Sequence, residues 1–150
     1  MKKYLIPALL LILCFTMVLS SCAKNSVKEP EILKNELAEA GFTVFLYSPT
    51  DTAKYNSMGN LFGLTDTSGV TNILIADNEG DGINEPRPLI VFYCQDLETT
   101  ERVFESAKKS LSEIARFISM PSEDDCNLIK LDNTVMVGHG EMIERARTLF

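Results

Sequence analysis

The chain has 150 residues, of which 45% are hydrophobic and 23% charged, and its formal net charge is −7 at pH 7. A chain of this length suits a single domain with a hydrophobic core of its own. Its acidic balance repels nucleic acids and anionic lipid headgroups, and we therefore expect neither as a ligand.

The first 21 residues have the composition of a secretory signal. Lys2 and Lys3 give a positive start, and the run from residue 5 to residue 19 carries no charge. A positive start, an apolar run and small residues at its end are the three parts of such a signal. Because the run is short for a bilayer span and is interrupted by Pro7, a cleaved signal is favoured over a transmembrane anchor.

The signal ends in a cysteine. The tetrapeptide Leu19-Ser20-Ser21-Cys22 resembles the lipobox of bacterial lipoproteins. The resemblance covers only the first two dozen residues. It implies a diacylglyceryl group on the Cys22 thiol, cleavage just before Cys22, and often acylation of the new amino terminus. It also implies an extracytoplasmic protein on a bacterial membrane, either the outer leaflet of the cytoplasmic membrane or the outer membrane. An ordinary secretory signal, with Cys22 present by chance, is the alternative.

Cleavage at this site divides the chain into three parts. Removing residues 1–21 takes away Lys2 and Lys3 and no acid, which changes the net charge from −7 to −9. Residues 22–28 form a short tether, whose polar stretch Ala23–Lys28 reaches at most ~20 Å when extended. Residues 29–150 are expected to form one domain, which lies close to the membrane because the tether is short.

The first elements of this domain are a helix and a strand. Pro30 fits the first turn of a helix over residues 29–40, and Gly41 fits the left-handed position after its end. The segment Phe42–Tyr47 is rich in aromatic and β-branched residues, as is typical of a strand. Residues 51–64 are ambiguous, because their pattern fits a short helix but includes two glycines.

Two further strands, Val70–Ala76 and Leu89–Cys94, enclose an acidic loop. The loop resembles the DxDxDG calcium-binding loops, and its candidate ligands are Asp77, Glu79, Asp81 and Glu85. It departs from that pattern at position 3, which is Glu, and at position 12, where proline replaces the bidentate Glu. A solvated turn is the alternative, because turns use Asp, Asn and Gly in any case. Weakly bound Ca²⁺ is the one cofactor that the sequence suggests.

The clearest helix covers residues 97–119, with Asp96 as its N-cap. Its apolar residues form one continuous stripe: Val103, Phe104, Ala107, Leu111, Ile114, Ala115 and Ile118. Next, Leu128–Leu131 and Thr134–Val137 flank Asp132-Asn133, which suits a tight hairpin. A last helix is expected over Glu141–Leu149.

This order of elements predicts the fold class. If residues 51–64 are helical, the middle of the chain reads β-α-β-β-α-β, the split βαβ pattern of ferredoxin-like domains. An extra helix stands at each end. We therefore expect an α+β fold with an antiparallel or mixed sheet of four to five strands.

Cys94 and Cys126 remain once Cys22 is lipidated, and two cysteines in an exported domain are compatible with a disulfide. In the ferredoxin-like order, however, the first strand (Phe42–Tyr47) lies between the third strand (Leu89–Cys94) and the fourth strand (Leu128–Leu131). The two cysteines then lie several strand spacings of ~4.8 Å apart. Because a disulfide needs Cα atoms within about 7 Å, we disfavour the bridge and expect two small buried residues.

Three functions compete. Both faces of Phe42–Tyr47 and Leu89–Cys94 are largely apolar, so helices cover the second face or that face binds a partner or a second copy. We therefore predict a lipid-anchored protein that acts by binding a protein or ligand and not by catalysis. A calcium-binding module is the alternative. An enzyme ranks third, because His139 is the single histidine and no catalytic signature surrounds either cysteine.

Overall fold

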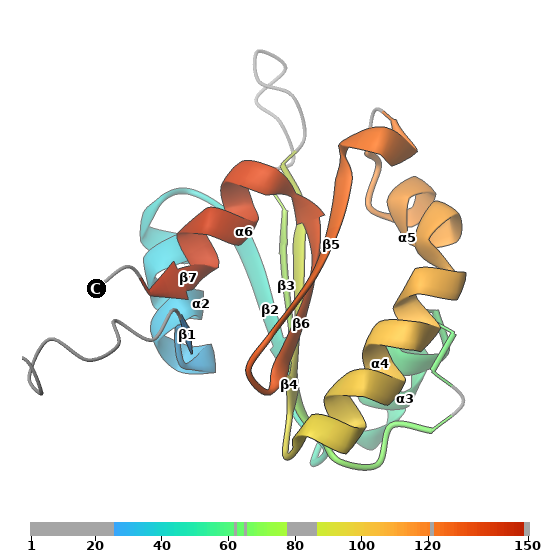
Figure 1. Cartoon of the computed structure of the whole chain (residues 1–150). Coiled ribbons are helices and arrows are strands. Elements are labelled where there is room, and N and C mark those ends of the chain that lie inside the picture. Colours follow the sequence, from blue (N-terminus) through green and yellow to red (C-terminus); the bar gives the residue numbers. More distant parts are fainter. Residues whose placement is uncertain (1–25, 62, 65, 78–86, 121, 149–150) are drawn as a thin grey trace, which may run out of the picture.

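The computed structural model describes residues 26–61, 63–64, 66–77, 87–120 and 122–148. They form three layers, with one antiparallel sheet between two groups of helices (Figure 1). In chain order the elements are β1 (Ser26–Val27), α2 (Pro30–Glu39), β2 (Thr43–Tyr47), α3 (Thr52–Leu61), β3 (Val70–Asp77), β4 (Leu89–Cys94), α4 (Leu97–Lys109), α5 (Leu111–Phe117), η1 (Glu123–Asp125), β5 (Cys126–Leu131), β6 (Thr134–His139), α6 (Gly140–Ala146) and β7 (Arg147–Thr148). The predicted α+β class is confirmed, and the ambiguous segment 51–64 contains a helix, α3, from Thr52 to Leu61. Within the described residues, no helix has the length and apolar character needed to cross a membrane.

The main sheet has five strands in the order β2-β3-β4-β6-β5, and each strand is antiparallel to its neighbours. The central strand, β4, is buried along its whole length. Its sequence LIVFYC allows this, because both of its alternating faces are apolar. A separate two-stranded sheet joins β1 to β7, near the two ends of the described chain.

Each face of the main sheet has its own core. On one face α3, α4 and α5 pack over Phe92, Ile73 and Val135. On the other face α2 and α6 pack over Leu74, Val91 and Met136. The terminal helices therefore cover the second face, which is the first of the two alternatives stated above.

Helix α2 ends as its sequence predicts. Gly41 has φ +90°, and its N–H donates to the Ala38 carbonyl at 3.0 Å. The Phe42 N–H donates to the Leu37 carbonyl, also at 3.0 Å. These two bonds form a Schellman motif, and the partly buried Phe42 ring packs against the core that contains Leu37. The turn delivers the chain directly into β2.

The long helix predicted over residues 97–119 is wrong as one continuous helix. Its N-cap is confirmed, since the Asp96 carboxylate accepts from the Thr99 N–H at 2.8 Å. At Ser110, however, φ is −106°, and α4 ends there and α5 begins. Both halves still face one core, to which α4 contributes Val103 and α5 contributes Ile114. The bend lets two straight segments follow a twisted sheet.

The last helix is shorter than the predicted Glu141–Leu149. Arg147 already has extended backbone, with φ −79° and ψ 144°, and β7 pairs with β1. Ser26 and Val27, which were expected in the tether, therefore belong to the folded domain. Leu149 lies outside the described residues. Pairing between the two ends of the chain has no local sequence signal, and this is why the helix end was misplaced.

The ferredoxin-like strand order is also wrong. That order places the first strand inside the sheet, whereas β2 lies at its edge. The inner position between β4 and β5 belongs to β6, which is buried from Thr134 to Gly138. Residues TVMVG are small or apolar on both faces, whereas β2 alternates exposed and half-buried positions. The strand with the better-buried sequence takes the inner place. One split βαβ unit remains, since β6 separates the parallel strands β4 and β5.

Candidate functional site

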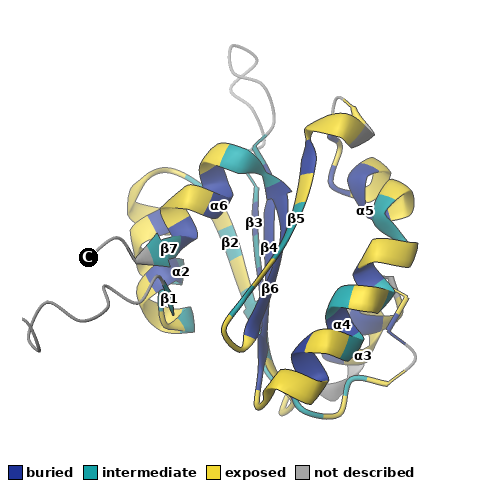
Figure 2. Ribbon diagram, in the orientation of Figure 1, coloured by how far each residue is buried: buried dark blue, intermediate teal, exposed yellow. Residues whose placement is uncertain are grey.

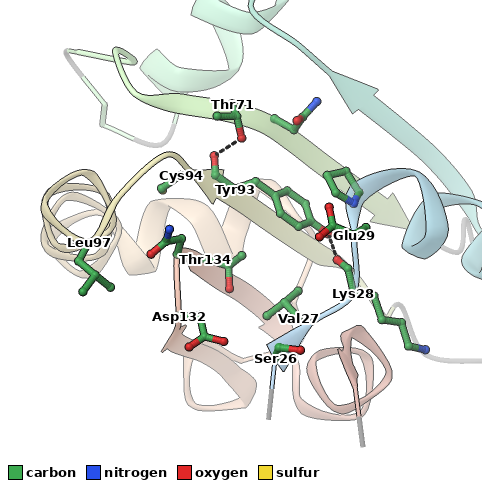
Figure 3. Close-up of a pocket in the computed structure, with 13 residues that line it drawn as sticks. Ser26, Val27, Lys28, Glu29, Thr71, Tyr93, Cys94, Leu97, Asp132 and Thr134 are labelled. Atoms are coloured by element: carbon green, nitrogen blue, oxygen red, sulfur yellow. Dashed lines mark hydrogen bonds between the residues drawn. The ribbon is translucent and has the colours of Figure 1, made fainter. Parts of the chain in front are cut away.

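A groove of about 550 Å³ lies where β4 ends and β3 begins (Figure 3). The segment that enters the domain forms one wall, the β5–β6 hairpin forms the other, and the exposed Leu97 lies at the rim. The lining residues are Ser26, Val27, Lys28, Glu29, Pro30, Thr71, Asn72, Tyr93, Cys94, Leu97, Asp132, Asn133 and Thr134.

Tyr93 positions the entering segment. Its side chain lies on the face covered by α2 and α6, and its hydroxyl donates to the Lys28 carbonyl at 2.9 Å. Burial raises the pKa of Tyr93, and the nearby Glu29 carboxylate raises it further. The phenol therefore stays a neutral hydrogen-bond donor at physiological pH. It holds residues 28 and 29 over the end of the sheet, and without this bond the first wall of the groove loses its support.

A bulge in β3 shapes the part of the groove lining that comes from Thr71 and Asn72. The register between β3 and β4 shifts between Val70 and Asn72. An extra residue of this kind leaves a backbone group unpaired and turns side chains away from the regular alternation. Thr71 compensates, because its hydroxyl donates to the Tyr93 carbonyl at 3.2 Å. Asn72 is half-buried beside it and contributes a polar amide to the lining.

The hairpin wall is held by three hydrogen bonds. Asp132 has φ +47°, as a tight two-residue turn requires. The Thr134 hydroxyl donates to the Leu131 carbonyl at 2.6 Å, and the Cys94 N–H donates to the Asn133 carbonyl at 2.8 Å. The Asn133 amide reaches the Gln95 carbonyl at 3.4 Å. The turn is therefore fixed against the end of β4.

The groove has an acidic balance. Among its described lining residues the one cationic side chain is Lys28, and it forms an ion pair with Glu36 of α2. The lining carboxylates are Glu29 and Asp132. With two carboxylates and one lysine, the described lining has a net negative formal charge, and the groove therefore favours neutral or positively charged ligands.

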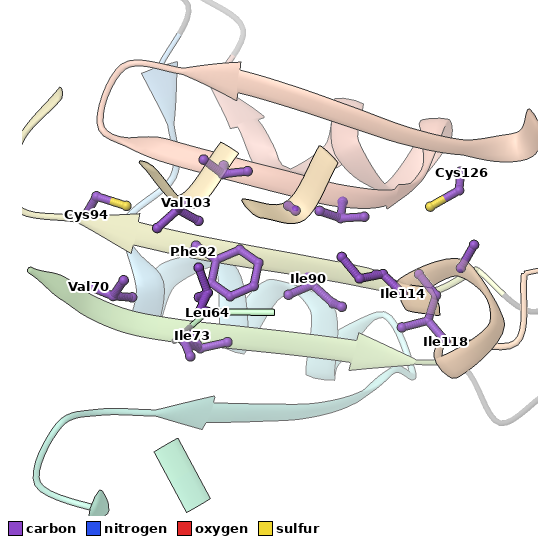
Figure 4. Close-up of a cluster of buried hydrophobic side chains, with 14 of the residues drawn as sticks. Leu64, Val70, Ile73, Ile90, Phe92, Cys94, Val103, Ile114, Ile118 and Cys126 are labelled. Carbon is purple, nitrogen blue, oxygen red and sulfur yellow. The ribbon is translucent and has the colours of Figure 1, made fainter. Parts of the chain in front are cut away.

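The structure separates the two cysteines. Cys94 pairs near the start of β6, and Cys126 lies opposite His139 at its end. Thr134 and His139 are five residues apart, which is ~17 Å along a strand. Figure 4 shows the two cysteines at opposite ends of one core, and no disulfide joins them. Cys94 and Cys126 are therefore not bridged. The strand that lies between theirs is β6, and not the first strand as the ferredoxin-like order had implied.

The two cysteines differ in their environment and in their distance from His139. Burial raises the pKa of the Cys94 thiol, while a hydrogen bond with Thr100 and the Arg102 charge lower it by less. Cys94 is thus a neutral thiol at physiological pH, and it is distant from His139. Cys126 is directly across from His139, but its side chain is buried in the core.

The calcium hypothesis falls mostly outside the described residues. Asp77 ends β3, whereas Glu79, Asp81 and Glu85 lie outside the part of the chain that the structure describes. Within that part, no group of three or more His, Cys, Asp or Glu side chains is arranged to hold a metal ion. The lipidation candidate, Cys22, also lies outside it. Both hypotheses stay predictions from the sequence.

Sequence reasoning missed the groove because no motif marks it. Its walls come from three distant segments, at residues 26–30, 71–72 and 132–134. The tyrosine in the otherwise apolar strand β4 was the one available signal, because a buried phenol needs a hydrogen-bond partner. Comparisons of the chain with protein-family models, with curated proteins and with solved structures found no match.

Proposed function

We propose that this protein is a bacterial lipoprotein, anchored by lipid on Cys22, whose extracytoplasmic domain acts by binding. The basic start, the uncharged run and the lipobox-like end of residues 1–22 support the anchor. Attachment through two or more acyl chains is stable, whereas one chain binds a membrane only marginally. The domain then faces away from the cytoplasm.

The observation that carries the binding function is the groove beside the entry to the domain. Ser26 lines it and is four residues after Cys22, a span of at most ~14 Å. The groove therefore lies close to the membrane surface. Its hydroxyl and amide groups, apolar rim and acidic balance suit a small polar ligand that carries no negative charge.

The anchor is tested by two cysteine substitutions in the signal. Cys22→Ser in the full chain, expressed in a bacterium, should leave the precursor uncleaved and remove the processed protein from the detergent phase. Cys14→Ser is the matched control, because Cys14 lies inside the uncharged run and has no role in the lipobox. Normal processing of the Cys22→Ser chain would contradict the proposed anchor.

The groove is tested with three small probes of different charge: spermidine, N,N′-diacetylchitobiose and citrate. Backbone amide resonances of Thr71, Asn72 and Asn133 should shift with one or both of the first two and not with citrate. Asn72→Leu should weaken these shifts without unfolding the domain, because the side chain is only half-buried. Binding of citrate alone, or shifts confined to other parts of the domain, would contradict a groove for ligands without negative charge.

A further inference from the structure

Strand β2 is an open edge of the main sheet. Among the described strands it pairs only with β3, and its other side carries backbone groups with no strand beside them. Phe45, at its centre, is 52% exposed and stacks on Tyr47, with ring centroids 6.3 Å apart and planes 15° from parallel. Figure 2 shows the contrast between this partly exposed strand and the fully buried β4.

The β2 edge lacks the features by which proteins usually protect an edge strand. Such edges commonly carry charges, proline or a bulge, because an unprotected edge pairs with another strand. The residues of β2, TVFLY, include no charge and no proline, and the register with β3 is regular. The opposite edge differs: β5 carries Lys130, which forms an ion pair with Glu101 and lies 5.0 Å from the centre of the Phe104 ring.

We infer that β2 is a dimerisation strand that pairs antiparallel with β2 of a second copy of this chain. The sequence is self-complementary about its centre. A two-fold axis through Phe45 places Phe45 against Phe45 of the other copy, Val44 against Leu46, and Thr43 against Tyr47. The two five-stranded sheets then form one continuous sheet. This contact closes on itself, as an isologous interface must.

The position of the amino termini favours a second copy as the partner. Antiparallel pairing of two edges in one continuous sheet requires a two-fold axis perpendicular to that sheet. Both α2–α6 layers then lie on the same side of the dimer. Segment β1, which leads to Cys22, is in this layer (Figure 1). The two anchors of the dimer therefore point to one side and can enter the same membrane.

The size of the contact sets its strength. Five residues per copy are far fewer than the 20–30 residues per side of a standard interface. The contact is therefore weak in dilute solution. Confinement of two anchored copies to one membrane raises their effective concentration. This step and the orientation of the two amino termini rest on the lipid anchor proposed above, whereas the pairing of β2 does not.

The test is a disulfide cross-link at the two-fold axis. Residues directly opposite in an antiparallel pair have Cα atoms about 4.5–5.5 Å apart, within the range that a disulfide spans. Phe45→Cys in the full chain, oxidised in isolated membranes, should give a covalent dimer at least tenfold more abundant than the unsubstituted chain does. Phe117→Cys is the matched control, because Phe117 is 49% exposed but lies on α5.

A second pair of variants checks the register. Thr43→Cys and Tyr47→Cys should cross-link when the two are co-expressed, and neither should cross-link when expressed alone. All three substituted positions on β2 are exposed or half-buried, and the variants should therefore fold. Melting temperatures equal to that of the unsubstituted chain would show this.

The outcomes separate the dimer from the anchor. A membrane-bound Phe45→Cys chain that does not cross-link, or that cross-links no more than Phe117→Cys, overturns the dimer. If the chain is instead soluble, the anchor fails, and the same oxidation of purified protein at about 1 mM decides the pairing of β2: a dimer specific to Phe45→Cys supports it, and no such dimer overturns it.

Discussion

Asp96 shows how one side chain starts the longest helix. Its carboxylate accepts the Thr99 N–H, and this bond lowers the pKa of the Asp96 carboxyl below its ordinary value. A folded pKa below the unfolded one adds stability at pH values above the unfolded pKa, and this stability is lost as the pH falls through the folded pKa. The cap therefore acts at neutral pH and fails in acid.

We predict that Asp96→Ala lowers the melting temperature at pH 7 by roughly 3–8 °C. The difference from the unsubstituted protein should shrink as the pH falls below the ordinary pKa of an aspartate. Asp96→Asn should keep most of the cap, because asparagine is an equally good N-cap residue. Glu105→Ala, at an exposed position of the same helix, is the control. Thermal melts between pH 2.5 and 7 measure the effect, and a constant difference across this range would contradict the assigned role.

The two cysteines give a second prediction at this scale. Because Cys94 and Cys126 lie at opposite ends of β6, both thiols should be reduced in the mature protein. Alkylation of denatured protein without reductant should label both, and alkylation of native protein should label neither quickly, since both are buried. Labelling that appears only after addition of a reductant would show a bridge and would contradict the strand order.

At the scale of elements, the helical stripe predicts where substitutions destabilise the protein. Ile114 is fully buried on α5, whereas Phe117, three residues later on the same helix, is half-exposed. Ile114→Ala should reduce the free energy of unfolding by ~2–5 kcal/mol. Phe117→Ala should change it by less than about 1 kcal/mol, in spite of the larger truncation. Urea unfolding measures both, and equal losses would mean that the helix faces the core in a different phase.

The acidic loop between β3 and β4 gives another prediction. If the loop binds calcium through Asp77, Glu79, Asp81 and Glu85, the absence of a bidentate acid at position 12 should make the site weak, with Kd on the order of 10⁻⁴–10⁻³ M. Calcium at ten times Kd should stabilise the fold by about 1.4 kcal/mol. Melting temperatures measured through a calcium titration test this, with the double variant Asp77→Asn/Asp81→Asn as control. If millimolar calcium shifts neither protein, the loop is a solvated turn.

Local elements were predictable from the sequence because their signals are local. The Gly41 helix end, the Asp96 cap and the Asp132-Asn133 turn each depend on one or two residues and their immediate neighbours. The strand order was not predictable in this way. It depends on which strand is best buried between two others, and β6 takes that place from β2. The bend at Ser110 and the early end of α6 likewise follow from contacts with a twisted sheet and with β1.

At the scale of the whole molecule, the two ends of the main sheet carry different groups. The groove, Cys94 and the entry to the domain share one end, where Ser26 leads toward Cys22. Asp77, Cys126 and His139 share the opposite end. From the sequence we placed only the two cysteines relative to one another, because the other members of each set come from segments that are far apart along the chain. Only the fold assigns the groove to the end nearest the proposed membrane anchor.

The lipid anchor on Cys22 is the central claim, and the mass of the mature amino-terminal peptide tests it most directly. Trypsin cleaves after Lys24, so the mature protein should release the peptide Cys22-Ala23-Lys24. We predict that this peptide begins at Cys22 and carries the added mass of a diacylglyceryl group on its thiol. A peptide that begins upstream of Cys22, or one with an unmodified Cys22 thiol, would contradict the account.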